Sequence, residues 1–127
     1  MLLVRIDLAK GKPAEFRRAL GDVVYKAMTD IIAVPENDKF QIITEHAPEE
    51  LNYAPSYLGI EHSPDLVLIQ ITLSVGRTVE AKQAFYKEIA EQLHAQLGLR
   101  KEDVFINLVE TAKENWSFGN GIAQYVV

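Results

Sequence analysis

The feature that most constrains the fold is an internal repeat, in which the second half of the chain matches the first at one constant offset. Residues 36–45, ENDKFQIITE, return as residues 101–110, KEDVFINLVE, at an offset of 65 positions (103 − 38) that aligns Asp38 with Asp103. Further pairs at the same offset, without a gap, are Val4 with Ile69, Gly11 with Gly76, Lys12 with Arg77, Glu15 with Glu80 and Phe40 with Phe105. The chain therefore uses one unit twice, over residues 1–46 and 66–111.

Each unit is predicted to contain a strand, a helix and a second strand. In the first unit, alternating apolar residues predict strands over residues 2–8 and 39–46, and apolar residues three and four apart predict a helix from Pro13 up to Val34. In the second unit the same patterns predict strands over residues 66–73 and 104–109 and a helix over residues 79–97, which Gly98 closes. Residues 47–65 hold three prolines and predict a connector with one short strand over 57–60. Residues 122–127 are expected to pair as a strand with a neighbouring subunit.

Two tandem β-α-β units predict an α+β fold with a four-stranded mixed sheet and both helices on one face, because crossover helices join parallel strands with a fixed hand. A ferredoxin-like fold has the same element order but interleaves its strands, and the ungapped duplication favours adjacent pairs over this alternative. The strand over 66–73 is apolar enough to be covered on both faces. Since Leu3, Ile69 and Ile71 cannot all lie under two helices, we expect a bare apolar sheet face and hence an oligomer.

Composition narrows the class of protein. With 127 residues and 48% apolar content the chain is predicted to form one domain over residues 1–127. Its 18 acidic and 13 basic residues would repel phosphate backbones, so no nucleic acid partner is expected. No apolar run is long enough for a bilayer, no leader precedes the first polar residues, and cysteine is absent, so we expect a cytoplasmic protein without a membrane partner. His46, His62 and His94 form no metal-binding spacing, and no metal or cofactor is expected.

Four further motifs carry a family resemblance: VPENDKFQ over residues 34–41, TEHAP over 44–48, FYK over 85–87 and WSFG over 116–119. Together with the duplicated unit they resemble the tautomerase superfamily, and within it the malonate semialdehyde decarboxylase group. The resemblance covers nearly the whole chain. It implies a homotrimer whose sheets surround a central barrel, with a pocket near the beginning of each first strand.

The resemblance also implies a set of catalytic residues. In that family the catalytic group is an N-terminal proline exposed after the initiator Met is removed, assisted by an aspartate in the turn before the second strand and by arginines just after the third. Asp38 matches the aspartate and Arg77 matches one arginine, whereas Val75 stands where the other arginine is expected. Leu2 stands at the proline position, and because Met is removed poorly before a bulky side chain, the expected terminus is Met1.

Two outcomes are open for this terminus. The primary α-amine of Met1, with an ordinary pKa of about 7.7–8.0, serves as the catalytic acid or base. Alternatively, the extra residue plugs the pocket and the chemistry is lost.

Arg77 and Asp38 each have a functional and a structural interpretation. Arg77 is the candidate for a two-pronged contact with a substrate carboxylate, or it is a solvated arginine near Glu80. Asp38 either orients a carbonyl or a water, or closes a turn as Asp103 is expected to do. Lys12, the repeat partner of Arg77, is interpreted as surface charge.

The remaining substrate-binding candidates are Leu2, His46, Trp116 and Phe118. Aromatic walls exclude water from a pocket, although core packing is the commoner use of Trp116 and Phe118. For His46 the alternative is a hydrogen-bonded structural histidine at the end of the second strand.

Three functional hypotheses follow. The first is a cofactor-free enzyme, a tautomerase (isomerase) or a decarboxylase (lyase), acting on a short oxo or enol carboxylic acid; Val75 makes a substrate other than malonate semialdehyde plausible. The second is a noncatalytic trimer that binds a small anion or a protein, which Leu2 favours. The third and weaker hypothesis is a ferredoxin-like dimer of the small monooxygenase kind.

Overall fold

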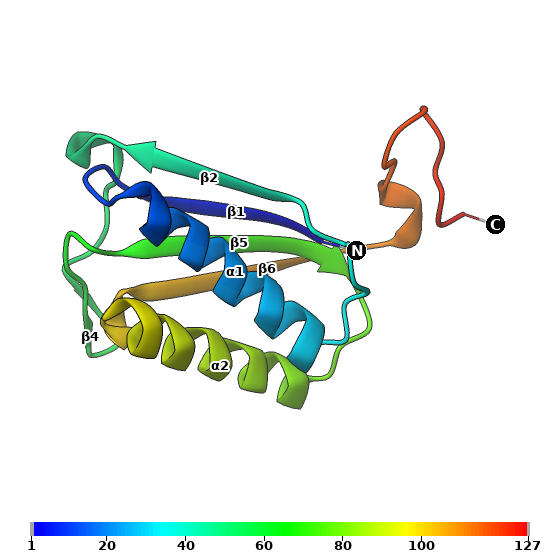
Figure 1. The fold of residues 1–127 in the computed structure, drawn as a ribbon. Helices are drawn as coiled ribbons and strands as arrows, with labels where there is room; N and C mark the ends of the chain where they lie inside the picture. Colours follow the sequence, from blue (N-terminus) through cyan, green and yellow to red (C-terminus); the bar gives the residue numbers. More distant parts are fainter. Residues whose placement is uncertain (1, 127) are drawn as a thin grey trace.

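The computed structural model describes residues 2–126 and contains two β-α-β units side by side (Figure 1). The first unit consists of β1 (Leu2–Ala9), α1 (Ala14–Ile31) and β2 (Gln41–His46). The second consists of β5 (Val67–Ser74), α2 (Val79–Leu97) and β6 (Val104–Thr111). Short elements complete the chain: the 3₁₀ turns η1 (Pro48–Glu50), η2 (Lys101–Asp103) and η3 (Lys113–Asn115), and the strands β3 (Ser56–Tyr57) and β4 (Ile60–Glu61).

The main sheet has the strand order β2-β1-β5-β6. The pairs β1/β2 and β5/β6 are parallel, and the central pair β1/β5 is antiparallel. Both helices cover the same face of this sheet (Figure 1). The predicted mixed four-stranded α+β fold is therefore confirmed, and the interleaved ferredoxin-like order is wrong because each unit keeps its two strands adjacent.

The 65-residue offset recurs in the positions of the elements. β1 and β5 differ by 65 at both ends, as do η1 and η3, and α1 and α2 begin at Ala14 and Val79. At the centre of the antiparallel pair Arg5 lies opposite Gln70, its own repeat equivalent (5 + 65 = 70). The two units are thus related by an approximate two-fold axis that passes between these two residues.

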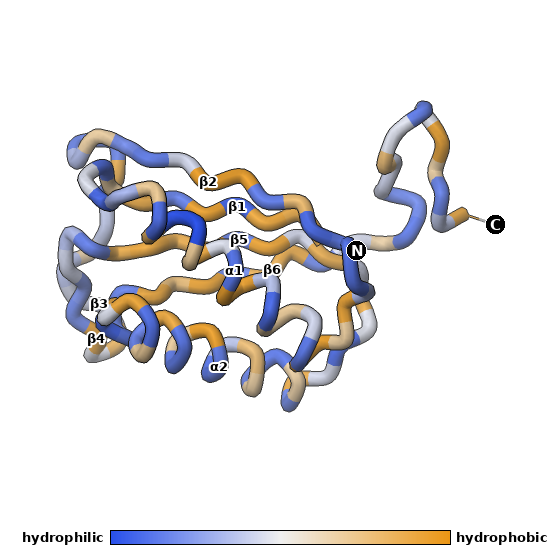
Figure 2. Tube along the Cα trace, in the orientation of Figure 1, coloured by the Kyte–Doolittle hydropathy of each residue, from blue (hydrophilic) through white to orange (hydrophobic). Residues whose placement is uncertain are grey.

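The core lies between the sheet and the helices. Alternate residues of the two central strands are at most 2% exposed: Leu2, Val4, Ile6 and Leu8 of β1, and Val67, Ile69, Ile71 and Leu73 of β5. The helices add fully buried residues at three- and four-residue spacing: Leu20, Val24 and Met28 of α1, and Phe85, Ile89 and Leu93 of α2. Figure 2 shows the resulting concentration of apolar residues along the strands.

The uncovered face of the sheet holds the half-buried Leu3, as predicted, but differs from the prediction for Ile69 and Ile71. Ile69 and Ile71 are 1% and 0% exposed and face the helices, because alternate residues of one strand lie on the same face. The centre of the uncovered face is polar, with Arg5 and Gln70 exposed. Its exposed apolar side chains lie on the edge strands instead, with Ile42 at 42% and Phe105 at 46%.

One smaller prediction also differs from the structure, and the pairing predicted for residues 122–127 with a neighbouring subunit stays a prediction. The connector contains a hairpin, β3 and β4, in place of one strand, and Leu58 and Gly59 at its turn both have positive φ, as tight two-residue hairpin turns require. Residues 122–126 form no strand within this single chain; they follow β6 at the end of the sheet where β1 begins (Figure 1). Within residues 2–126, no helix combines the length and apolarity needed to cross a membrane.

Candidate active site

The candidate active site lies at the end of the sheet where β1 begins. Leu2 pairs with Leu73 near the end of β5, and the backbone N–H of Val4 donates to the carbonyl of Phe40 at 2.9 Å. The beginning of β1 is therefore flanked by the turn that precedes β2 and by the loop that follows β5. Met1, predicted to be catalytic, lies outside the described residues. Leu2 itself is only 1% exposed, so its side chain belongs to the core.

The turn before β2 holds Asp38 at this end of the molecule. The N–H of Asp38 donates to the Pro35 carbonyl at 3.2 Å, and the N–H of Asn37 donates to the hydroxyl of Tyr25 on α1 at 3.0 Å. Asp38 is 8% exposed. A carboxylate that is shielded from water interacts strongly with charge nearby, so Asp38 is suited to act on groups near the start of β1. The anchoring role of Tyr25 was missed, although its polar tip at the edge of an apolar helix face was a signal.

Arg77 is held between the end of β5 and the end of α1. Its Nη1 donates to the Ser74 carbonyl at 3.0 Å, and its Nε donates to the carbonyl of Ile32, the C-terminal cap of α1, at 3.3 Å. These two bonds fix the guanidinium and leave other N–H donors of its five for a ligand. A partly buried, fixed guanidinium of this kind can bind a carboxylate with two parallel hydrogen bonds.

Trp116 and Phe118 lie at the same end of the sheet. The indole N–H of Trp116 donates to Oγ1 of Thr111 at 2.8 Å, and Thr111 Oγ1 donates to the Leu73 carbonyl at 3.2 Å. The rings of Trp116 and Phe118 are stacked, with centroids 5.6 Å apart and planes 15° from parallel. Both rings therefore form an aromatic wall beside the ends of β5 and β6. The linking role of Thr111 was not predicted, because its partners come from other segments.

His46 is the one described candidate that lies elsewhere. It pairs with Ala9 at the far end of β1, seven residue steps (9 − 2) from Leu2, or roughly 23 Å at about 3.3 Å per residue. There its Nε2 lies 2.6 Å from Oδ1 of Asp7 on the uncovered face of the sheet. Because β1 and β2 are parallel, the end of β2 cannot reach the beginning of β1 within one subunit. Within one subunit His46 is therefore separated from the other candidates, and its contact with Asp7 is of the kind that its structural interpretation expected.

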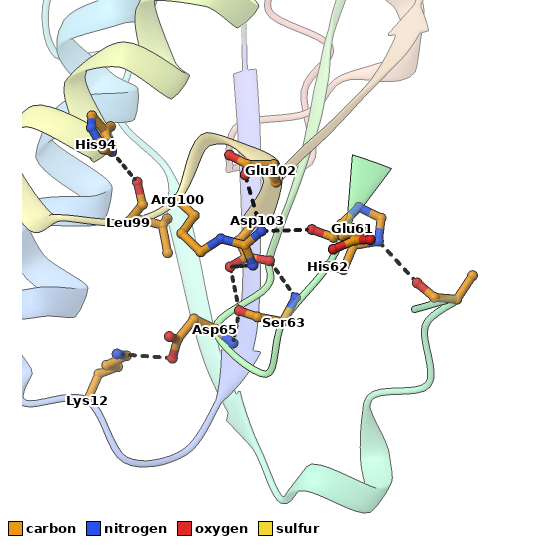
Figure 3. A network of polar contacts seen from close by, with 11 residues as sticks. Lys12, Glu61, His62, Ser63, Asp65, His94, Leu99, Arg100, Glu102 and Asp103 are labelled. Carbon is orange, nitrogen blue, oxygen red and sulfur yellow. Dashed lines mark hydrogen bonds and ion pairs between the residues drawn. The ribbon is translucent and has the colours of Figure 1, made fainter. Parts of the chain in front are cut away.

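Asp103, the repeat equivalent of Asp38, has a structural role. It is 0% exposed and accepts hydrogen bonds from the N–H and the hydroxyl of Ser63, while Arg100 lies 3.5 Å away (Figure 3). The neighbouring Glu102 has a lowered pKa, because first a backbone N–H and then Arg100 stabilise its carboxylate. Asp103 thus links η2 to the connector before β5, as a turn-closing residue was expected to do.

Comparisons with known proteins bear on the whole chain. Two family models, each described as "Tautomerase enzyme", match residues 38–119 and residues 3–59. "Probable tautomerase YusQ" of Bacillus subtilis (strain 168) is 42% identical over 126 residues, which is 99% of each chain. "Probable tautomerase YrdN" of the same organism is 33% identical, over 99% of this chain and 97% of that one.

Solved structures with the same fold have similar sequences. FG41 malonate semialdehyde decarboxylase inhibited by 3-bromopropiolate superposes with a TM-score of 0.90 and 43% identity, over 98% of this chain and 94% of that one. Another malonate semialdehyde decarboxylase gives a TM-score of 0.90 and 33% identity, over 98% and 95% of the two chains. A fused 4-OT, solved as a symmetric trimer, gives 0.78 and 25% identity over 94% of each chain.

Proposed function

The chain belongs to the tautomerase superfamily, and from this membership we propose that it is an enzyme that moves a proton on a short oxo or enol carboxylic acid, by tautomerisation or by decarboxylation. The observation that carries the proposal is the anchored guanidinium of Arg77, at the same end of the sheet as Asp38 and the beginning of β1. The similarity of the whole chain to two malonate semialdehyde decarboxylases supports decarboxylation of a 3-oxo acid as the reaction.

Each group of the site has a role in this proposal. Arg77 binds the substrate carboxylate, and the protonated α-amine at the beginning of the chain polarises the 3-oxo group. The bond between the carboxylate and the α-carbon breaks, its electron pair passes into an enolate, and carbon dioxide leaves. The amine then protonates the α-carbon, while Asp38 orients the carbonyl or a water. In tautomerisation of an enol acid the same amine, unprotonated, removes the proton of the enol hydroxyl; the C=O bond forms, and the amine returns a proton to a carbon of the former double bond system.

Replacement of Arg77 tests the proposal. Arg77→Gln is expected to lower kcat/KM for 3-oxopropanoate, phenylenolpyruvate or 2-hydroxymuconate about 100-fold, or roughly 2.7 kcal/mol, because the carboxylate loses its fixed partner. The matched control is Arg18→Gln, at an exposed arginine in the first half of α1, which removes the same charge and should leave the rate unchanged. Equal losses in both variants would show that general charge, and not this contact, supports turnover.

A noncatalytic binding protein is the second candidate function. The observation that favours it is Leu2, a core leucine where the related enzymes have a catalytic proline. The same assay separates the two candidates: an inactive native chain whose Leu2→Pro variant turns over the acid supports the binding protein. Turnover by the native chain that depends on Arg77 supports the enzyme.

We propose further that the protein is a homotrimer. The similar fused 4-OT is a symmetric trimer, and the uncovered sheet face has exposed Ile42 and Phe105 on its edge strands. Because such side chains favour association, light scattering is expected to give a mass of about 43 kDa, three times 14.3 kDa. A mass near 14 or 29 kDa would contradict the trimer.

A further inference from the structure

A cavity of about 280 Å³ lies at the end of the sheet opposite the candidate active site. Its walls come from the end of β1, the loop and first turn that lead into α1, the η1 segment and the beginning of β5. Nothing in the proposed reaction uses these residues. The volume is close to the lower limit of about 300 Å³ that is usual for small-molecule sites, so a small ligand fits it best.

The cavity is the repeat equivalent of the candidate active site. Subtracting 65 converts Arg77 into Lys12, Trp116 into Leu51 and Phe118 into Tyr53, and these three equivalents all line the cavity. The correspondence is structural as well as sequential, because η1 and η3, which precede Leu51 and Trp116, have the same offset. The first unit and the connector after it therefore place Lys12, Leu51 and Tyr53 beside the first strand of the second unit, at the positions equivalent to Arg77, Trp116 and Phe118.

The charges on the cavity wall favour an anion. Lys10, Lys12 and Asp65 are its charged residues, and together they give a net charge of +1. Lys12 Nζ lies 3.1 Å from Asp65 Oδ1 (Figure 3) and 5.2 Å from the centre of the Phe16 ring. The N–H groups at the beginning of α1 add positive potential, because Pro13 at the cap supplies no side-chain acceptor, although Glu15 in the first turn partly offsets it. A ligand with one negative charge and an apolar body thus matches both the charge and the apolar wall.

At this cavity, the positions equivalent to the two proposed proton-transfer groups hold residues that form hydrogen bonds within the protein. Leu66 takes the place of residue 1, and its backbone nitrogen is an amide that donates to the Ser63 carbonyl at 3.0 Å. Asp103 takes the place of Asp38, and Ser63 and Arg100 engage its carboxylate. An amide has no basic lone pair and no exchangeable ammonium proton, so this recess can bind a ligand without transforming it.

We propose that the cavity is a second, noncatalytic binding site for a small monocarboxylate with an aromatic or aliphatic body. Lys12 binds the carboxylate, which competes with Asp65 for the ammonium group. The apolar body packs against Leu51, Tyr53 and Phe16. This site is independent of the proposed reaction, so either can fail alone.

The first experiment follows backbone amide resonances of the ¹⁵N-labelled native protein during titration with benzoate, and with benzamide as the neutral isostere. Benzoate is expected to shift the amides of residues 49–53 and 65–67 saturably, and to bind at least about tenfold more tightly than benzamide, because only benzoate gains the charged contact. Benzoate shifts confined to residues near Trp116, no shifts at all, or equal affinity for the two compounds would overturn the proposal.

Two variants change the affinity in opposite directions. Lys12→Gln is expected to weaken benzoate binding at this site about tenfold and leave benzamide binding unchanged. Asp65→Asn is expected to strengthen benzoate binding several-fold, because it removes the competing carboxylate. Lys101→Gln, a charge-matched control at an exposed lysine that does not line the cavity, should have no effect. Weakening in all three variants, or in Lys101→Gln as much as in Lys12→Gln, would refute a specific contact. Turnover of Lys12→Gln should equal that of the native enzyme.

Discussion

Replacing Phe85 by alanine is expected to lower the free energy of unfolding by about 3–5 kcal/mol, the usual cost of removing a buried aromatic ring. Phe85 is 0% exposed and is the first of the three buried residues, with Ile89 and Leu93, on the face that α2 turns toward the sheet. Its repeat equivalent, Leu20, is also 0% exposed, so the opposite half of the core is already filled and cannot collapse into the space. The loss therefore combines the transfer of the ring with the cost of a residual cavity.

Urea denaturation at one fixed protein concentration measures this effect, because subunit association would make the apparent stability depend on concentration. Lys87→Ala, on the exposed side of the same helix, is the control and should change stability by no more than about 0.5 kcal/mol. A loss below about 1.5 kcal/mol in Phe85→Ala would mean that the core repacks around the missing ring.

Asp103→Asn is expected to cost about 1–3 kcal/mol of stability, the range seen when a buried hydrogen-bonding group loses its matched partner. The carboxylate accepts two hydrogen bonds from Ser63 and has Arg100 beside it. An asparagine of the same shape directs N–H groups at one of these donors, so a favourable contact becomes a repulsive one.

The matched comparison for Asp103 is its exposed neighbour, where Glu102→Gln makes the same chemical change in contact with water and should have little effect. Ser63→Ala provides an intermediate case, with an expected loss of about 1 kcal/mol because only the hydroxyl contact is removed. Equal stability losses in the Asp103 and Glu102 variants would show that burial does not amplify this contact.

The main elements were predictable because they follow from local periodicity and from the repeat. Alternation over residues 2–8 and helical spacing after Pro13 predicted β1 and α1 to within a few residues, and Gly98 does adopt the left-handed conformation expected at the end of α2. The adjacent pairing of strands followed from a duplication without gaps. These features depend on residues close in the chain, where one sequence contains the necessary information.

The arrangement of side chains between elements was harder to predict. The strand over residues 66–73 was judged by its overall apolarity, although Gln70 and Thr72 at alternate positions indicate that Ile69 and Ile71 share the opposite face, under the helices. His46 was grouped with the site through a motif, although the parallel pairing of β2 places it at the other end of the sheet. Lys12 was interpreted as surface charge because a cavity between three segments is invisible in the sequence.

The pairing of Arg5 with Gln70 bears on how the two halves of a duplicated chain can diverge in sequence from each other. Two identical half-length chains that dimerised through this register would have identical recesses at both ends of the sheet, each beside a free amine. Tethering the halves through residues 47–65 turns one of these amines into a peptide bond. The recess beside this peptide bond has no amine for proton transfer. Sequence changes there can therefore favour ligand binding alone.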